Sequence, residues 1–192
     1  MLALEVIIGS TRPGRFSEKV VPWLRETLAR HAEFEAEFLD LRDYPLPFYD
    51  QPVTPSEIKD GAYAHEAVRA WAQKIQEGDA YLIITPEYNR GPSAVLKNAL
   101  DSVWYEWNDK PVGFVAYGNA GGARSVEQLR LTSIELQMAP VRRAVHIRDP
   151  WNLLDEHGEL KVGSLDFYTK HLDQMLGQLA AWGEALKKAR RS

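Results

Sequence analysis

Short apolar runs recur along the chain and are separated by polar or amphipathic stretches. The runs at 2–8 and 80–85 are nearly continuous and rich in β-branched residues, which is typical of strands buried on both faces of a parallel sheet. Residues 33–40 alternate apolar residues with glutamates, the pattern of a half-exposed edge strand. Two further apolar runs, at 111–118 and 142–147, bring the predicted strands to five.

Apolar residues spaced three or four apart predict a helix after each strand. Ser17 and Ser93 are positioned to cap two of these helices, and Pro22 should bend the first. The predicted apolar stripes are Phe16, Val20, Leu24 and Leu28; Val68, Trp71, Ala72 and Ile75; Val95, Leu96, Ala99 and Leu100; Val126, Leu129, Ser133 and Leu136; and Tyr168, Leu172, Met175, Leu176, Leu179, Trp182 and Leu186.

Strands alternating with helices predict an α/β fold, a doubly wound parallel sheet with helices on both faces. No repeat, low-complexity segment or change of composition divides the chain, so we expect residues 1–192 to form a single domain. In the flavodoxin-like strand order 2-1-3-4-5, ligands bind where strands 1 and 3 meet, outside the carboxyl ends of the strands. The loops after residues 8, 85 and 117 should therefore converge on a binding site.

Composition narrows the chemistry available to this site. The formal net charge is −4, which argues against broad attraction to nucleic acid or an anionic membrane. The absence of cysteine excludes disulfides, thiolate catalysis and iron–sulfur clusters, and the five histidines show no metal-ligand spacing. No signal peptide is evident, and we expect a cytoplasmic protein that depends on ordinary side chains or a bound cofactor.

The first loop, GSTRPGRFS at residues 9–17, joins glycines, hydroxyls and two arginines to the start of a helix. A helix N-terminus favours an anion, so the loop predicts a phosphate site. The glycine spacing resembles a nucleotide P-loop, but Arg15 and Phe16 stand where that loop needs lysine and a metal-binding hydroxyl. We therefore reject a P-loop NTPase; a tight turn with solvated arginines is the structural alternative.

The other two loops are PEYNRGPS at 86–93 and YGNAGGARS at 117–125. Two prolines stiffen the former, and its tyrosine offers a flat face to a ligand. Three glycines in the latter allow the backbone to approach a ligand closely. Either segment alone fits an ordinary strand-to-helix loop. Together, the three loops predict a site for a phosphorylated, flat ligand with polar edges.

These segments resemble the NADPH-dependent FMN reductases of flavodoxin-like fold, which include quinone and chromate reductases. The family pattern G-S-x-R-x-x-S is similar to GSTRPGRFS, and P-E-Y-N…L-K-N-A-[IL]-D matches PEYNRGPSAVLKNALD residue for residue. The family's G-x-x-G-G corresponds to GNAGG. The likeness extends in order from residue 3 to about residue 150.

The resemblance implies that three groups of residues bind FMN. Two positions differ from the family, because many relatives have Ser at position 15 and Asn at position 17. Arg15 either contacts the phosphate or points into solvent.

The implied phosphate ligands are Ser10, Arg12 and Ser17, with Arg15 as a further candidate. The isoalloxazine would contact Pro86, Glu87, Tyr88 and Asn89 on one side and Tyr117, Gly118, Gly121 and Gly122 on the other.

The implied activity is an FMN-dependent NAD(P)H oxidoreductase, with hydride passing from NADPH or NADH to flavin N5 and then to a quinone, flavin or similar small acceptor. No catalytic acid or base follows, and for Glu87 we favour helix capping or an inter-subunit salt bridge. The alternatives are an FMN electron carrier without NAD(P)H turnover and a flavin-free relative. The family also implies a homodimer or homotetramer, in which the aromatics of DSVWYEW (101–107) either line the seam or pack locally.

Overall fold

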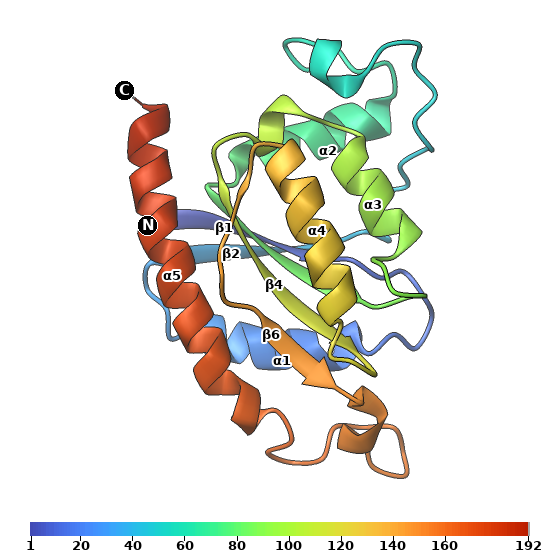
Figure 1. Ribbon diagram of the computed structural model, residues 1–192, viewed down its shortest axis with the longest axis vertical. Coiled ribbons are helices and arrows are strands. Elements are labelled where there is room, and N and C mark those ends of the chain that lie inside the picture. The colour runs from blue at the N-terminus through green and yellow to red at the C-terminus, as the bar shows by residue number, and fades with distance from the viewer. Residues whose placement is uncertain (192) are drawn as a thin grey trace.

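A single twisted parallel sheet forms the centre of the computed structural model, which describes residues 1–191 (Figure 1). The strand order is β2-β1-β3-β4-β5, and β6 also pairs with β4. All of these pairings are parallel, so the predicted doubly wound α/β fold with order 2-1-3-4-5 is confirmed. The strands are β1 Leu2–Ile8, β2 Phe34–Asp40, β3 Ala80–Pro86, β4 Pro111–Gly118, β5 Ala139–Pro140 and β6 Val145–Arg148.

The fifth position of the sheet differs from the prediction of one strand at 142–147. Two short strands, β5 and β6, pair with the beginning and the end of β4. Pro140 has no amide proton to continue the ladder. Between the two strands, Arg142 and Arg143 are exposed, so the chain leaves the sheet edge there and returns at Val145.

Helices cover both faces of the sheet. α1 and α5 pack on one face, and α2, α3 and α4 on the other (Figure 1). Within residues 1–191, no helix is both long enough and apolar enough to cross a membrane. The helices are α1 Ser17–Leu28, α2 Glu66–Glu77, α3 Ala94–Asp101, α4 Ala123–Glu135 and α5 Asp166–Arg190, with 3-10 turns at Pro55–Glu57 (η1), Tyr105–Trp107 (η2) and Pro150–Leu153 (η3).

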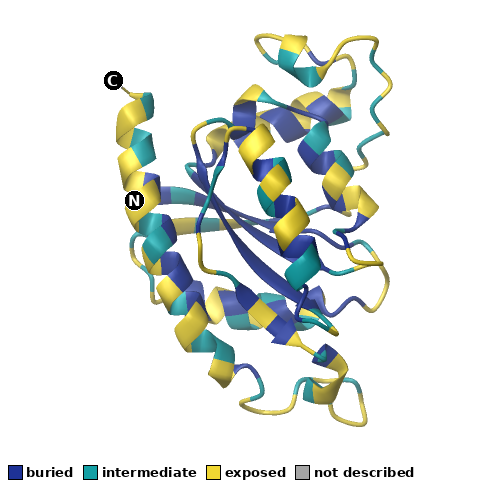
Figure 2. Cartoon of the chain, in the orientation of Figure 1, coloured by how far each residue is buried: buried dark blue, intermediate teal, exposed yellow. Residues whose placement is uncertain are grey.

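Burial follows the hydrophobic pattern that predicted the elements. Every residue of β3 is buried, whereas β2 alternates between buried and exposed positions at the sheet edge. Figure 2 shows the buried strands between helices whose outer faces are exposed. The stripe of α2 is buried as predicted, and the apolar stripe of α5 is buried between Leu172 and Leu179, but Trp182 is 41 % exposed.

Helix-capping predictions are confirmed in one case and wrong in the other. Ser93 caps α3, because its Oγ accepts a hydrogen bond from the amide of Leu96 at 3.2 Å. Ser17 instead forms the first turn of α1, since Phe16 before it already has helical backbone angles. Pro22 lies inside α1, which continues to Leu28.

Candidate functional site

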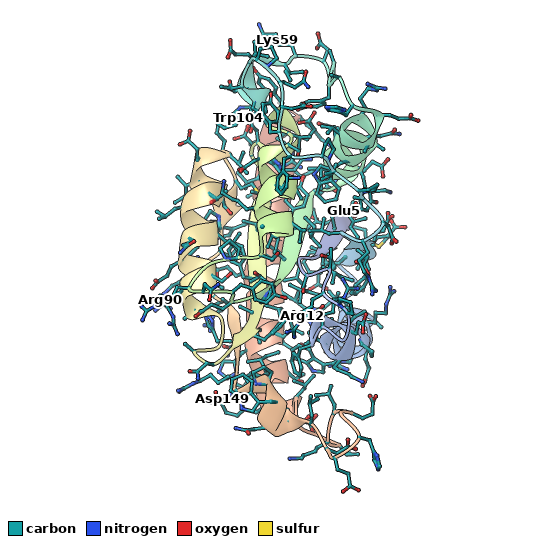
Figure 3. The ribbon with its side chains drawn as sticks, turned by 90° about the vertical axis from the view of Figure 1, so that its right-hand side faces the viewer. Glu5, Arg12, Lys59, Arg90, Trp104 and Asp149 are labelled. Carbon is teal, nitrogen blue, oxygen red and sulfur yellow. The ribbon has the colours of Figure 1, made fainter. Side chains whose placement is uncertain are left out.

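Three loops meet at the carboxyl edge of the sheet, after the adjacent strands β1, β3 and β4. Figure 3 faces this edge, where Arg12 marks the first loop and Arg90 the second. The Ser93 hydroxyl donates to the Gly9 carbonyl and so joins these two loops. The predicted convergence of the loops is confirmed.

Arg15 does not point into solvent. It is 3 % exposed, and its guanidinium donates to the Ser10 carbonyl and to both carboxylate oxygens of Asp40, at the end of β2. Although burial alone would raise the pKa of Asp40, hydrogen bonds from Arg15 and Arg42 hold that pKa well below its ordinary value. Arg15 therefore ties the first loop to the neighbouring strand, and a contact between Arg15 and a cofactor stays a prediction.

Arg12, by contrast, is exposed at the mouth of the same loop. Ser10, two positions earlier in the loop, is 1 % exposed. An exposed guanidinium keeps its hydrogen-bond donors available for a phosphate, to which it can bind through two parallel bonds. The two arginines of the loop thus occupy different environments, one buried and paired, the other at the surface.

Ser17 buries a hydroxyl that the protein itself does not satisfy. Ser17 is 0 % exposed, and its Oγ has no hydrogen-bond partner of normal geometry within residues 1–191. Leaving a buried hydroxyl unpaired costs about 1–3 kcal/mol. The hydroxyl lies in the first turn of α1, where the helix dipole favours negative charge. This position suits a phosphate oxygen as the missing partner.

Further hydroxyls gather beside Ser17. Tyr88 Oη lies 3.0 Å from Ser10 Oγ, and the Tyr117 hydroxyl is buried without a hydrogen-bond partner of normal geometry in the described chain. Burial raises the pKa of Tyr117, while the nearby hydroxyls of Ser17 and Ser10 partly offset that rise. The Phe16 ring packs on Tyr117 with centroids 5.2 Å apart. Hydroxyl donors around a helix start fit the phosphate of FMN.

The second loop is a tight turn of two residues. Tyr88 and Gly91 exchange both backbone hydrogen bonds, at 2.9 and 3.0 Å. The central residues, Asn89 and Arg90, have φ of 49° and 71°, the left-handed pair found in type I′ turns. Gln128 of α4 donates to the Arg90 carbonyl at 2.7 Å and so fixes the turn from below. The stiffness predicted from the prolines is therefore built mainly from backbone hydrogen bonds.

Glu87 links the second loop to the third. Its Oε2 accepts a hydrogen bond from the amide of Arg124 in the first turn of α4, at 3.1 Å. Its Oε1 lies 2.9 Å from Nε of the same arginine. The Glu87 amide also donates to the Tyr117 carbonyl at 3.1 Å. The helix-capping role expected for Glu87 is confirmed, and it fixes the spacing between the two loops.

Glycines in the third loop are required by the packing of the chain itself. Gly121 and Gly122 have φ of 65° and 70°. A Cβ on Gly122 would lie 2.6 Å from the Ala116 Cβ, and one on Gly121 would lie 2.9 Å from the His146 Cβ. Both positions face the sheet, so the loop can lie flat across the end of β4. Contact between these glycines and a flavin stays a prediction.

Several aromatic residues and a separate cleft lie away from this site. Trp107 is 0 % exposed and packs edge-on against Tyr81 in the core, whereas Tyr105 is 45 % exposed. A cleft of about 630 Å³ opens between α2, residues 59–61 and η2. Figure 3 labels Lys59 and Trp104 at this end, far from Arg12. The aromatic density of 101–107 is therefore explained in part by the core.

Three contributing side chains were missed by the sequence analysis. Asp40 fixes Arg15, and the hydroxyls of Thr85 and Ser125 lie 3.0 Å apart beneath the second and third loops. A signal for Asp40 existed, because strand order 2-1-3 places the carboxyl end of strand 2 beside the first loop. No comparable signal exists for Ser125, which looks like any small residue of a helix.

The comparisons with known families and proteins agree with this geometry. The profile described as NADPH-dependent FMN reductase matches residues 3–152. An NAD(P)H-dependent FMN reductase of Schizosaccharomyces pombe is 38 % identical over 88 % of this chain and 83 % of its own length. A 2-hydroxy-1,4-benzoquinone reductase of a Burkholderia species is 34 % identical over 94 % of this chain and 96 % of its own.

Among solved structures, the flavoenzyme NAD(P)H:(acceptor) oxidoreductase FerB of Paracoccus denitrificans superposes with a TM-score of 0.72. The match covers 96 % of this chain and 98 % of that one, at 23 % sequence identity. At this identity the structural likeness supports the fold alone. The sequence matches, in contrast, cover nearly the whole chain.

Proposed function

The chain belongs to the NADPH-dependent FMN reductase family, and from this premise we propose that Ser10, Arg12 and Ser17 hold the phosphate of FMN. Family membership makes the protein an FMN-dependent NAD(P)H oxidoreductase rather than a simple electron carrier. The observation that carries the assignment of the phosphate site is the buried, unpartnered hydroxyl of Ser17 in the first turn of α1.

The two other loops would hold the ring system. We assign one side of the isoalloxazine to residues 86–89 and the other to Tyr117, Gly118, Gly121 and Gly122. Support comes from the tight turn at 88–91 and from the Glu87–Arg124 link, which together keep two loops at a fixed separation. A rigid frame of this kind lets the protein orient a flat ring without an induced change.

FMN supplies the hydride chemistry of the reaction, and the residues of this chain supply binding and orientation. Arg15 and Asp40 hold the first loop in place, which would keep the Ser10 and Ser17 hydroxyls in position to bind the phosphate. We assign no acid or base. A quinone is the acceptor that we propose, supported by the Burkholderia relative, whose name is 2-hydroxy-1,4-benzoquinone reductase.

Assembly is the second part of the proposal. Val95 of α3 and Leu131 and Ile134 of α4 are 39 %, 71 % and 62 % exposed, on helices that cover the same face of the sheet (Figure 2). Exposed apolar side chains on helices of one face favour burial against a second copy. We propose a homodimer through this face, which a homotetramer would repeat. The cytoplasmic location expected from the sequence stays a prediction.

A visible spectrum tests the cofactor site directly. Purified protein incubated with FMN and desalted should retain a flavin spectrum that bleaches when NADPH or NADH is added without oxygen, and a benzoquinone should restore it. The Ser17→Ala variant should retain less FMN at the same protein concentration. Full FMN retention by Ser17→Ala, with unchanged affinity, would remove Ser17 from the phosphate site but leave the reductase activity standing.

A further inference from the structure

Glu5 is a buried carboxylate in the middle of β1, on the face covered by α2, and the reductase chemistry makes no use of it. It is 3 % exposed, and its Oε2 has no hydrogen-bond partner in residues 1–191. Gly78 leaves room for it, since a Cβ there would lie 2.8 Å from the Glu5 Cγ. Figure 3 labels Glu5 apart from Arg12 and Arg90 of the loops. A buried, unpaired carboxylate destabilises a fold unless something compensates its charge.

Two more carboxylates converge on the same place. Glu37 of β2 is the register partner of Glu5 on the adjacent strand, and Glu77 is the last residue of α2. One carboxylate oxygen from each of the three glutamates lies within 4.8 Å of the other two. Like charges opposite each other on paired strands repel, and an acidic residue at a helix C-terminus opposes the dipole. All three placements are unfavourable for the protein alone.

Lys74 compensates only part of this negative charge. Its Nζ lies 2.9 Å from Glu37 and 2.7 Å from Glu77, whereas no hydrogen bond joins it to Glu5. Three carboxylates therefore share one directly bound ammonium group, and the buried member of the set is the one left without a partner.

We propose that Glu5, Glu37 and Glu77 form a binding site for a hard divalent cation, with calcium as the best fit. Carboxylate oxygens are the ligands that such ions prefer, and calcium holds them at about 2.4 Å, so two of its ligands lie at most about 4.8 Å apart. Magnesium demands near-octahedral geometry and usually takes only one or two carboxylates, so a set of three glutamates fits it less well. The cation joins β1, β2 and α2, and displaces Lys74.

An entry path exists on the outer side of the cluster. The side chains of Glu37 and Glu77 are 53 % and 49 % exposed, and that of Lys74 is 25 % exposed. Lys74 can therefore swing into water when a cation enters, while Glu5 forms the buried floor of the site. The site lies away from the flavin loops, so its occupancy should change stability without changing flavin reduction.

Thermal unfolding of the FMN-loaded protein tests the site. After removal of metals with a chelator, calcium should raise the Tm of the wild type by about 5 °C at saturation, and magnesium by less. Glu5→Gln should abolish the rise while keeping the flavin spectrum, which shows that this variant is folded. Glu127→Gln, at an exposed position of α4, is the matched control and should keep the full rise.

Lys74→Met separates the cation site from a simple ion-pair cluster. Removing the competing ammonium should tighten calcium binding at least about tenfold in a calorimetric titration, because the carboxylates lose their other cation. If neither the wild type nor Lys74→Met binds calcium at millimolar concentrations, Lys74 is the only cation of the cluster and the proposal is wrong. A rise of the Tm that persists in Glu5→Gln would also overturn it, by placing the ion elsewhere.

Discussion

Polar side chains are buried at both ends of the sheet, but the two ends satisfy them differently. At the amino end, Lys110 Nζ donates to the carbonyls of Ile75 and Gln76 and to the Tyr81 hydroxyl, at 3.0 to 3.1 Å. The carbonyls belong to the last turn of α2, so the lysine also neutralises the negative end of that helix. The protein supplies every partner of this ammonium group.

At the carboxyl end, the hydroxyls of Ser17 and Tyr117 are also buried and lie near each other, yet neither has a hydrogen-bond partner of normal geometry in the described chain. The difference shows how to separate groups that hold the fold from groups that hold a ligand. A satisfied group at either end has its partners before any ligand binds, whereas an unsatisfied one gains its partner only on binding. Removing a satisfied group should therefore change stability, and removing an unsatisfied one should change ligand binding.

The largest effect is expected for Arg15→Met, because the terminal nitrogens of this buried guanidinium bind Asp40 and the Ser10 carbonyl, and among the described residues only its Nε lacks a hydrogen-bond partner. The substitution removes the buried one of the two arginines that bind Asp40, leaves the exposed Arg42 as its remaining cation, and releases the Ser10 carbonyl. We expect a loss of about 4 kcal/mol in the free energy of unfolding, measured with urea in the absence of FMN.

Arg12→Met is the matched control for that experiment. Arg12 is exposed, so its removal should change the free energy of unfolding by less than about 0.5 kcal/mol while weakening FMN binding. Equal losses of stability in the two variants would contradict the assignment of Arg15 to the fold and Arg12 to the ligand.

Lys110→Met should change the pH dependence of stability without affecting the flavin. Burial lowers the pKa of Lys110 from 10.5 to about 8, and Arg190 adds to this while Asp79, Glu106 and Glu5 oppose it. Burying the charged ammonium therefore disfavours folding fully below pH 8, and this penalty disappears as the pH rises from 8 to 10.5. Over that range the wild type should gain up to about 3 kcal/mol relative to Lys110→Met.

Urea unfolding of the wild type and of Lys110→Met at several pH values measures the difference in their free energies of unfolding. Other titrating groups are present in both proteins, so their contributions cancel. FMN affinity should stay the same, since Lys110 lies at the amino end of β4. If the difference in free energy of unfolding between the two proteins stays constant from pH 8 to 10.5, the pKa of Lys110 is not lowered by burial, and the prediction is wrong.

Ser17→Ala should change the affinity for FMN and leave stability nearly unchanged, whereas Lys110→Met should change stability and leave the affinity unchanged. The hydroxyl has no partner in residues 1–191, so its removal should leave the stability of the FMN-free protein unchanged or slightly higher. The Kd for FMN should rise about tenfold, because a charge-assisted hydrogen bond to the phosphate is lost. Fluorescence quenching of FMN measures this Kd.

Ser125→Ala provides the contrast, as its hydroxyl is equally buried but pairs with Thr85 at 3.0 Å. This variant should lose about 1 kcal/mol of stability and keep its affinity for FMN. A tenfold loss of affinity in both variants would show that burial alone, rather than the missing partner, sets the effect.

Much of the fold could be predicted from the sequence, because the spacing of apolar residues indicates which face of each strand or helix is buried. The runs at 2–8 and 80–85 became the central strands β1 and β3, and the stripe ending at Ile75 became the buried face of α2. The split of the fifth strand was not readable, because Pro140 and the exposed Arg142 interrupt pairing without ending the apolar pattern.

The site was readable at the level of its loops but not of its internal bonds. Motifs in the three loops locate the edge where they meet. Arg15 and Asp40 are 25 positions apart in the sequence. The local sequence of the first loop therefore does not indicate which of its two arginines is buried. The packing of Gly122 against Ala116 is likewise a tertiary contact, which a glycine-rich pattern cannot distinguish from approach to a ligand.

The smallest effect is expected in the turn of the second loop. Arg90 has φ of 71°, a conformation that glycine adopts more easily than arginine, so Arg90→Gly should stabilise the protein by about 0.5 kcal/mol. Asn89→Gly, at φ of 49°, should gain less, because asparagine already tolerates this region. Urea unfolding measures both, and a loss of stability in Arg90→Gly would mean that the arginine side chain makes a contact that outweighs its strained backbone.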